Sequence, residues 1–475
     1  MSEQTANSRR SRGLIRGLGL WAGTAVVVGS MIGQAVFLVT GDMARQVGSP
    51  TKVLLLWIVG GIVVLCGALC YAELGAAVPE AGGDYFYLSR GLTPVWGFLF
   101  GWTSAMILKP APAAVITAGI VRFAAFILPS ISMPIFTWHL RFPLLSHSYQ
   151  FTVSAVQPLA VAVLIVVTAI NYFSVKTVGR FQIFLTTLKV VGIVAIVILG
   201  LIPGKAIAVK SDSLPAPVHA PLEALLMALV PVMLAYNGFQ WLGNVGAEIV
   251  RPRTTLPRAA IFGTSLVITL YVLINWVYFR VLGFSTAARS EHVASDALTV
   301  LVGASGAKWL TAFMIISAFG SLHAGFLTGP RIPYAMACEG NFFSFARRIH
   351  PVFHSPSLAL IFQGCIAIVL VLTGTYQELY SYDMFATWAF FPLTVVALFW
   401  LRQKEPELPR PYRVWGYPWT PLIFGVAALA ISLNLFLLNP VRSSIGLGII
   451  LLGVPFFRHW RRRASVFTDS THEQS

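Results

Sequence analysis

Long apolar stretches alternate with short polar connections along the whole chain. The hydrocarbon core of a bilayer is about 30 Å thick, and a helix needs roughly 20 predominantly apolar residues to cross it. Most of the stretches reach about this length, so each is interpreted as a membrane-spanning helix. The pattern predicts an all-α polytopic membrane protein with 12 transmembrane helices, near residues 18–40, 53–78, 94–128, 156–174, 182–202, 222–249, 259–282, 303–335, 357–374, 379–401, 419–438 and 443–457.

Two of these predicted spans, the first and the sixth, contain residues that poorly support a continuous helix. The first is interrupted at residues 29–33, which read GSMIG, and the sixth at residues 236–238, which read YNG. Glycines in membrane helices also allow close helix packing. Two breaks at corresponding positions nevertheless favour a binding site, because backbone groups freed by a break need substrate, ion or water as partners.

The same breaks divide the chain into repeated blocks. Counting five spans from each break gives blocks of similar length, residues 18–202 and 222–401. Each block has an odd number of spans and begins with an interrupted helix, which predicts a five-plus-five inverted repeat. The remaining predicted parts are a cytoplasmic N-terminal tail, a cytoplasmic linker, two additional helices and a cytoplasmic C-terminal tail, at residues 1–17, 402–418, 419–457 and 458–475.

Composition and charge agree with this interpretation. Hydrophobic residues make up 57% of the chain and charged residues 11%, whereas about 25% of a soluble protein is charged. The net charge of +16 does not indicate nucleic-acid binding, because the polar segments are too short to form a binding domain. Most Lys and Arg residues lie on the side of the N-terminus when the spans are threaded. The positive-inside rule therefore predicts a multi-pass protein of the plasma (cell inner) membrane with both termini cytoplasmic.

No residue pattern predicts catalysis, a metal site or a cofactor. The four cysteines, Cys66, Cys70, Cys338 and Cys365, lie in or at the ends of apolar stretches. Cys66 and Cys70 have the helical spacing of a metal-ligand pair, but no further ligand is near in sequence, so both are interpreted as core residues. A membrane hydrolase would place a clustered base and nucleophile, or paired carboxylates, within its spans, and none stands out. A channel would not need paired breaks in two equal blocks.

Several long motifs, in the same order along nearly the whole chain, carry a family resemblance. The chain resembles the amino acid-polyamine-organocation superfamily of transporters, and within it the L-type amino acid transporter branch. The resemblance implies a five-plus-five inverted repeat of the LeuT type with two extra helices, moving neutral amino acids by alternating access. The motifs are GSMIGQAVF (29–37), PEAGGDYFYLSRGLTPVWGFLFGW (79–102), NYFSVKTVGRFQ (171–182), AYNGFQWLGNVGAEIVRPRTTLPRA (235–259), SAFGSLHAG (317–325) and LRQKEPELPRPYRVWGYPWTP (401–421).

The resemblance also implies a substrate site at the two breaks. The family's substrate carboxylate meets backbone at positions that correspond here to Ile32, Gly33, Gln34 and Ala35. Its amino group meets carbonyls near Gly29 in the first break and near the second break, at Ala235, Tyr236, Asn237 and Gly238. Phe239 resembles the aromatic residue that closes over the substrate, although it also suits an ordinary apolar wall.

The first break departs from the family pattern. Relatives normally have Gly-Ser-Gly-Ile-Phe, whereas this chain has Gly-Gln-Ala-Val-Phe at residues 33–37. Gln34 adds bulk and an amide, and Ala35 makes positive φ less accessible than glycine would. We expect altered selectivity, with the Gln34 amide directed toward a polar group of the substrate. The alternative is a non-transporting amino acid sensor.

Lys189 lies about seven residues into the fifth predicted span, roughly 10 Å from its end. A buried ammonium is costly and therefore a functional candidate, although a long side chain can also reach the interface. In similar sodium-independent transporters a lysine here replaces a sodium ion, which implies contacts with the Gly29 carbonyl and the Ser317 or Ser321 hydroxyl. A fixed charge predicts sodium-independent exchange, and a titrating one predicts proton-coupled uptake.

Other polar residues within spans are interpreted structurally. Lys109 is expected to be a hydrogen-bonded brace and His323 a core histidine, while Glu73 and Glu248 are expected to pair with local arginines. Asp and Glu otherwise look nearly absent from mid-span positions.

The predicted partners are an amino acid substrate, the lipid bilayer and, in the proton-coupled alternative, protons. Some animal members of the branch are linked to a single-span heavy chain through a cysteine between spans three and four. Residues 129–155 contain no cysteine, so no disulfide-linked heavy chain is predicted.

Overall fold

A computed structural model describes residues 13–141, 148–202, 221–303, 305–373 and 376–472. Within these ranges ten helices are long and apolar enough to cross a membrane. Two further predicted spans coincide with shorter apolar helices, Val156–Tyr172 and Ser357–Thr373. The prediction of a helical, multi-pass membrane protein is therefore confirmed at this level.

The helices follow one another with short connections. The first group comprises α2 (Leu20–Met31), α3 (Ala35–Leu38), α4 (Thr40–Val47), α5 (Pro50–Ala77), α6 (Asp84–Gly91), α7 (Pro94–Thr103), the π-helix η1 (Ser104–Leu108), α8 (Pro110–Ile127) and η2 (Pro129–Ser132). The second group comprises α9 (Val156–Tyr172), α10 (Val175–Leu201), α11 (Pro221–Ala235), η3 (Phe239–Asn244), η4 (Gly246–Glu248), α12 (Pro252–Leu282), α13 (Phe284–Arg289) and α14 (Val293–Val302). The third comprises α15 (Gly306–Thr328), α16 (Arg331–Cys338), η5 (Ser344–Arg347), α17 (Ser357–Thr373), α18 (Tyr376–Lys404), α19 (Trp419–Leu438) and α20 (Pro440–His472).

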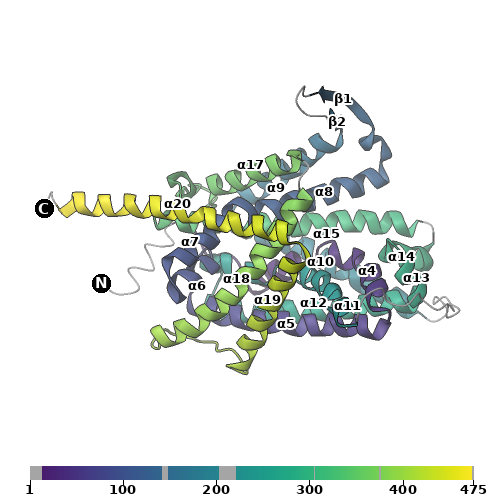
Figure 1. Ribbon diagram of the computed structural model, residues 1–475, viewed down its shortest axis with the longest axis horizontal. Helices are drawn as coiled ribbons and strands as arrows, with labels where there is room; N and C mark the ends of the chain where they lie inside the picture. The colour runs from purple at the N-terminus through teal and green to yellow at the C-terminus, as the bar shows by residue number, and fades with distance from the viewer. Residues whose placement is uncertain (1–12, 142–147, 203–220, 304, 374–375, 473–475) are drawn as a thin grey trace.

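One connection departs from the all-α prediction. Between η2 and α9 the strands β1 (Pro134–Arg141) and β2 (Ser148–Ser154) form an antiparallel pair in which Trp138 lies opposite Phe151. The hairpin projects away from the helices at the top of Figure 1. Its β-branched and aromatic residues favour strands, a pattern too short to stand out beside the apolar runs.

Helix α2 lies at the centre of the packing. Every residue from Ala22 to Met31 is buried, because α2 packs against α10, α12 and α15. Several long helices, among them α5, α15 and α20, run roughly along the long axis of the molecule (Figure 1). A helix that is apolar on all sides suits a position inside a membrane bundle.

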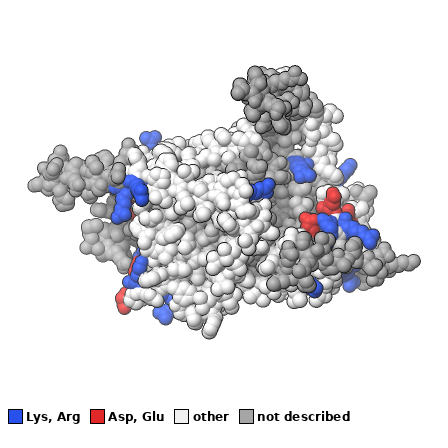
Figure 2. Space-filling view, viewed as in Figure 1, with Lys and Arg blue, Asp and Glu red and all other residues white. Residues whose placement is uncertain are grey.

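The outer surface is apolar over its middle. Leu429, Leu433 and Leu437 of α19 are 51%, 55% and 78% exposed. On the face in Figure 2 the charged side chains lie mainly toward the two ends, and the broad region between them is almost uncharged. This distribution fits a lipid-facing belt between two polar ends.

Both predicted helix interruptions are present. Helix α2 ends at Met31 and α3 begins at Ala35, while α11 ends at Ala235 and η3 begins at Phe239. Gly238 has a φ of +120°, and a Cβ there would lie 2.9 Å from the Ser30 side chain. Glycine therefore supplies a backbone conformation that other residues rarely adopt, and it lets the two breaks approach each other.

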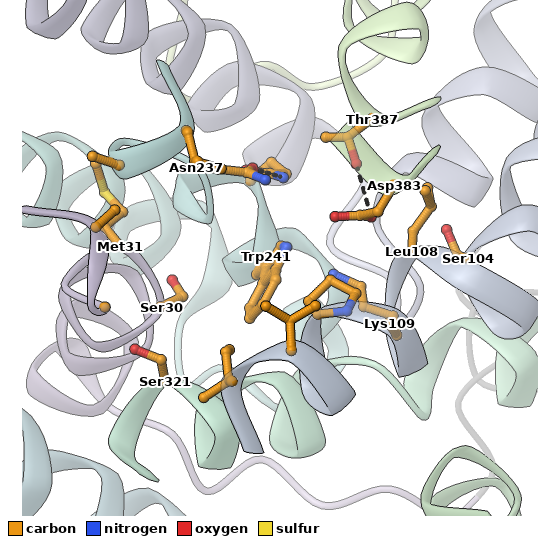
Figure 3. A pocket seen from close by; sticks show the side chains of 18 of the residues that line it. Ser30, Met31, Ser104, Leu108, Lys109, Asn237, Trp241, Ser321, Asp383 and Thr387 are labelled. Carbon is orange, nitrogen blue, oxygen red and sulfur yellow. Dashed lines mark hydrogen bonds between the residues drawn. The ribbon is translucent and has the colours of Figure 1, made fainter. Parts of the chain in front are cut away.

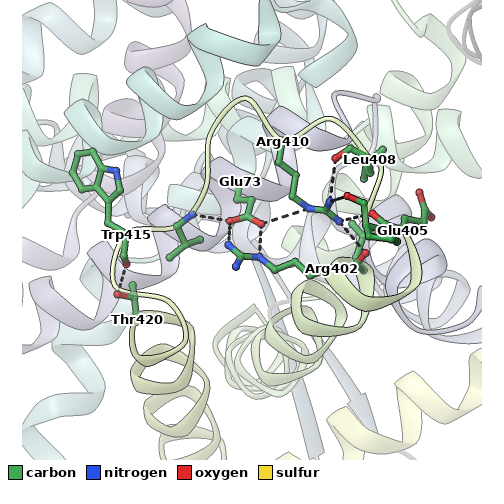
Figure 4. Close-up of polar contacts among 10 residues, drawn as sticks. Glu73, Arg402, Glu405, Leu408, Arg410, Trp415 and Thr420 are labelled. Carbon is green, nitrogen blue, oxygen red and sulfur yellow. Dashed lines mark hydrogen bonds and ion pairs between the residues drawn. The ribbon is translucent and has the colours of Figure 1, made fainter.

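Buried ion pairs join the ends of the spans. The Glu248 carboxylate receives two hydrogen bonds from Arg331, at 2.7 and 3.0 Å, and both side chains are almost fully buried. Glu73 accepts two hydrogen bonds from Arg402 and one from the backbone N–H of Val414, with Arg410 3.8 Å away (Figure 4). The expected ion pairs are present, but their arginines come from elements distant in sequence. The Glu73 contacts tie the 402–418 linker to α5, and the Glu248–Arg331 pair ties η4 to α16.

Candidate functional site

A cavity of about 290 Å³ lies between the two helix breaks and a wall formed by η1, α8 and α18 (Figure 3). Ligand pockets in proteins typically range from roughly 300 to 1,000 Å³, so this one suits a small molecule. The first break contributes Gly33, Gln34 and Ala35, and the second contributes Ala235 and Asn237. The cavity therefore forms where several segments distant in sequence meet.

Two side chains connect the breaks directly. The Ser30 hydroxyl lies 3.0 Å from the carbonyl oxygen of Gly238. The Tyr271 hydroxyl, on α12, lies 2.8 Å from the Met31 carbonyl and 3.2 Å from the Ala235 carbonyl. A phenol has one hydrogen to donate, so it is shared between the two carbonyls. Tyr271 could not be identified from the sequence, because a tyrosine within an apolar helix gives no signal of its own.

Lys189, on α10, lies behind the first break and is fully buried. Its Nζ donates to the carbonyl oxygens of Gly29 and Ile32, at 2.8 and 2.6 Å, and to Ser321 Oγ at 2.8 Å. An ammonium has three hydrogens, so all three find acceptors. Ser317 Oγ is 3.4 Å from the Ile32 carbonyl. The structure thus brings together the residues that the sequence analysis grouped around Lys189.

Gly29 is required for this arrangement on steric grounds. A Cβ at this position would lie 2.0 Å from Nε2 of Gln182 and 2.7 Å from Oγ1 of Thr186. Both neighbours are on α10 and contact the Ala25 carbonyl of α2. The missing side chain therefore lets α2 approach α10 closely enough for Lys189 to reach the break.

The opposite wall carries charge. Lys109 directly follows the π-helix η1. The Lys109 backbone N–H donates a hydrogen bond to the Ser104 carbonyl and so closes the wide turn of this helix. Pro110 then starts α8, where a missing N–H has no cost. The Nζ of Lys109 lies 3.9 Å from the ring centroid of Trp241, which is a cation–π contact. Asp383 on α18 lines the same wall and is 2% exposed.

Asp84, at the start of α6, is the second carboxylate beside the cavity. Its Oδ1 accepts hydrogen bonds from Tyr71 at 2.6 Å and from Thr394 at 3.1 Å. Burial raises the pKa of the Asp84 carboxyl to about 6, because a charged form is disfavoured away from water, while these two hydrogen bonds act in the opposite direction. Asp84 is thus held by protein groups, in contrast to Asp383.

The predicted site residues fall into two sets. Those that line the cavity are Gly33, Gln34, Ala35, Ala235, Asn237 and Ser321. Those outside its lining are Gly29, Ile32, Lys189, Ser317, Tyr236, Gly238 and Phe239. The Gly29 carbonyl is engaged by Lys189 and Ser321, so it is not turned toward a substrate.

The side chains of Phe239 and Gln34 lie elsewhere than their predicted roles require. Phe239 is 1% exposed and packs against Tyr71 and Phe391, with ring centroids 5.6 Å away in both cases. Trp241, two residues later in the 3-10 segment, forms the wall instead. The Gln34 amide lies 3.5 Å from the Ile116 carbonyl, so it contacts α8.

Asp383 was not singled out from the sequence, although it is a carboxylate within a predicted span. It lies inside the predicted tenth span, at residues 379–401, and inside the observed helix α18. A carboxylate within a membrane span is a functional candidate by default. The charge itself was therefore the available signal, as it was for Lys189.

Comparison with known proteins decides the family. A sequence model described as amino acid permease matches residues 18–456. The chain belongs to the amino acid permease family. The serine/threonine exchanger SteT of Bacillus subtilis is 28% identical over 457 residues, covering 95% of this chain and 98% of the relative. Mouse large neutral amino acids transporter small subunit 2 is 30% identical over 464 residues, covering 95% of this chain and 83% of the relative.

A third relative of this permease, the human cystine/glutamate transporter, is 30% identical over 448 residues, covering 94% of this chain and 85% of the relative. The resemblance to L-type amino acid transporters is thereby confirmed. The permease is an amino acid transporter and not an enzyme.

Proposed function

We propose that this permease exchanges neutral amino acids across the plasma (cell inner) membrane by alternating access, without sodium. The observation that carries the proposal is Lys189, whose ammonium occupies the junction of α2, α10 and α15 with three acceptors within 2.8 Å. The names of two relatives, a serine/threonine exchanger and a large neutral amino acids transporter, support both exchange and a neutral substrate.

Lys189 takes the place of a sodium ion in this proposal. A metal ion at a helix break is held by carbonyl and hydroxyl oxygens, the same groups that surround Nζ. Because every ammonium hydrogen has an acceptor, the charge is stabilised where it lies. This favours a permanent cation over one that releases its proton in each cycle, and so favours exchange over proton-coupled uptake.

The substrate's carboxylate binds the backbone at the start of α3, near Gly33, Gln34 and Ala35. The first N–H groups of a helix have no partners within it and carry partial positive charge. The amino group binds carbonyls where α11 ends, near Ala235 and Asn237. Gly29 and Ile32 act indirectly, because their carbonyls hold Lys189.

The architecture in this proposal is a LeuT-type inverted repeat, residues 18–202 and 222–401, followed by a linker and two additional helices at 402–418 and 419–457. Matched interruptions after α2 and α11 support it. Both termini are cytoplasmic by the positive-inside rule; residues 1–12 of the N-terminal tail lie outside the described residues, as do residues 473–475.

The permease works without a disulfide-linked heavy chain, since the connection at residues 129–155 has no cysteine. Non-reducing electrophoresis of the protein from its native membrane tests this, and a heterodimer that reducing agent separates would contradict it.

The transport proposal is tested with purified protein in liposomes and a panel of labelled amino acids. We expect uptake only when unlabelled amino acid is present inside, at the same rate with sodium or choline in the buffer. Uptake that instead follows an inward proton gradient, without internal amino acid, would establish proton coupling. Binding without any flux would establish the sensor alternative.

A further inference from the structure

Two buried groups of opposite charge face the same cavity without contacting each other. Lys109 is 7% exposed and Asp383 is 2% exposed, and both line the wall opposite the first helix break (Figure 3). Among the described residues, Asp383 accepts only a 3.4 Å hydrogen bond from Thr387. Within the same residues Lys109 Nζ has the face of Trp241 as its neighbour, but no hydrogen-bond acceptor.

This arrangement is costly unless something else completes it. An ionised group removed from water is strongly destabilised when it lacks a partner. Elsewhere in this protein the cost is met by direct pairing, as between Glu248 and Arg331 at 2.7 Å. Lys109 and Asp383 form no such pair and lie on the same wall of the cavity, where a polar ligand group can lie between them.

The two charges restrict the chemistry of that group. An ammonium only donates hydrogen bonds and a carboxylate only accepts them. A bridging group must therefore accept on the Lys109 side and donate on the Asp383 side. A carboxamide does both, with its carbonyl oxygen and its NH₂ at opposite corners of one planar group.

Other side chains meet this wall less well. A side-chain carboxylate is repelled by Asp383, and a side-chain ammonium is repelled by Lys109. A hydrocarbon side chain leaves both buried charges without partners, and sites built for hydrogen bonding discriminate strongly against such analogues. A hydroxyl donates and accepts through a single atom, so it spans a shorter distance.

We propose that Lys109 and Asp383 form a side-chain subsite that selects amino acids with a carboxamide side chain, asparagine or glutamine. The inference rests on the proposed function, in which the two helix breaks hold the substrate's carboxylate and amino group. The subsite lies on the facing wall, so one amino acid reaches both.

Asparagine, aspartate and leucine provide the first test, because their side chains have nearly the same shape and differ in polarity. Each unlabelled amino acid, and glutamine, competes against uptake of a labelled substrate in liposomes. Its binding to the purified full-length protein is measured separately by thermal shift. We expect asparagine or glutamine to bind about ten-fold or more tightly than leucine and aspartate. Equal binding of leucine would overturn the proposal.

Substitutions at the two charges provide the second test, because they should change selectivity in opposite directions. Asp383→Asn removes the repulsion between Asp383 and a carboxylate side chain of the substrate, so aspartate and glutamate should gain affinity relative to asparagine. Lys109→Met removes the repulsion between Lys109 and an ammonium side chain of the substrate, so 2,4-diaminobutyrate and lysine should gain affinity relative to asparagine. Asp42→Asn is the matched control, because Asp42 pairs with Arg45 at an exposed position and its loss leaves the selectivity unchanged.

A third variant keeps the test decisive if a single charge cannot be buried alone. The double variant Lys109→Met with Asp383→Leu removes both charges and is expected to favour leucine over asparagine. Equal weakening of all amino acids by every folded variant would contradict the subsite. Sodium-independent exchange without amide preference would overturn this inference and leave the proposed function standing. Preferential binding of asparagine without any transport would overturn the proposed function and leave this inference standing.

Discussion

Two buried lysines flank the cavity, and they differ in what surrounds the ammonium. Lys189 is fully buried and donates to three oxygens between 2.6 and 2.8 Å away. Lys109 is almost as buried, but its Nζ lies over an aromatic ring and beside open space. In Figure 3, Ser321 marks the Lys189 side and Lys109 the opposite side, with Trp241 between them.

The difference separates a charge that belongs to the framework from one that faces a ligand. Every hydrogen of the Lys189 ammonium is used by the protein, so this residue fixes the first break against α15. The Lys109 ammonium retains hydrogens for another partner. Sequence alone treats both as costly charges in a span, and only the positions of nearby oxygens distinguish them.

The largest expected effect concerns a buried charge with one direct partner. Glu248→Gln leaves the Arg331 guanidinium buried without a counter-ion, and breaking such a pair costs about 3–5 kcal/mol. We expect a clear fall in thermal unfolding temperature in detergent. Glu405→Gln is the control, because the Glu405–Arg90 pair is partly exposed and worth about 0–1 kcal/mol. Equal shifts for both variants would contradict this prediction.

Lys189→Met is expected to lower exchange of every amino acid about 100-fold. The substitution keeps most of the side-chain volume but removes the charge-assisted hydrogen bonds to two break carbonyls and to the Ser321 hydroxyl, and such bonds are worth about 1.5–3 kcal/mol each. Exchange in liposomes is measured per unit of reconstituted protein. Lys308→Met, at an exposed position of α15, should leave exchange unchanged. Normal exchange by Lys189→Met would remove the framework role.

Ser321→Ala is expected to have a smaller effect, about ten-fold on exchange. It removes one of three acceptors of Lys189, and a hydrogen bond to a charged group contributes about 1.5–3 kcal/mol. Ser432→Ala is the control, because the Ser432 hydroxyl donates to the Ala428 carbonyl of its own helix. An effect of Ser321→Ala no larger than that of the control would show that two acceptors suffice.

The smallest expected effect is at the departure from the family pattern. Changing Gln34→Ser together with Ala35→Gly removes the 3.5 Å contact of the amide with Ile116 and loosens the backbone of the first break. We expect relative affinities within the amino acid panel to change by about two- to five-fold, measured by competition in liposomes. An unchanged profile would show that Gln34 and Ala35 do not influence selectivity.

The sequence predicted the features that follow from apolar length and backbone chemistry. Apolar runs located the long helices, and glycine-rich interruptions located both breaks. The grouping of Lys189 with Gly29 and Ser321 came from motifs on three spans that family resemblance related to one another. The hairpin of β1 and β2 was missed because its alternation is brief.

The sequence predicted only some of the side chains that face the cavity. Asp383 and Lys109 are distant in sequence, and their approach depends on the rotation of α18 against η1. Phe239 and Trp241 lie on a 3-10 segment, where three residues make a turn, so the usual helical spacing does not tell which one points inward. Such assignments depend on packing between segments rather than on the pattern of any one segment.

The most direct test of the contrast between the two lysines measures asparagine and leucine with the same two variants. The affinity ratio comes from thermal shift, and exchange comes from liposomes. We predict that Lys109→Met changes the asparagine-to-leucine ratio about ten-fold while exchange of some amino acid persists. Lys189→Met should lower exchange of all amino acids and leave that ratio unchanged. The reverse result, with Lys189 setting selectivity and Lys109 required for all exchange, would contradict the account.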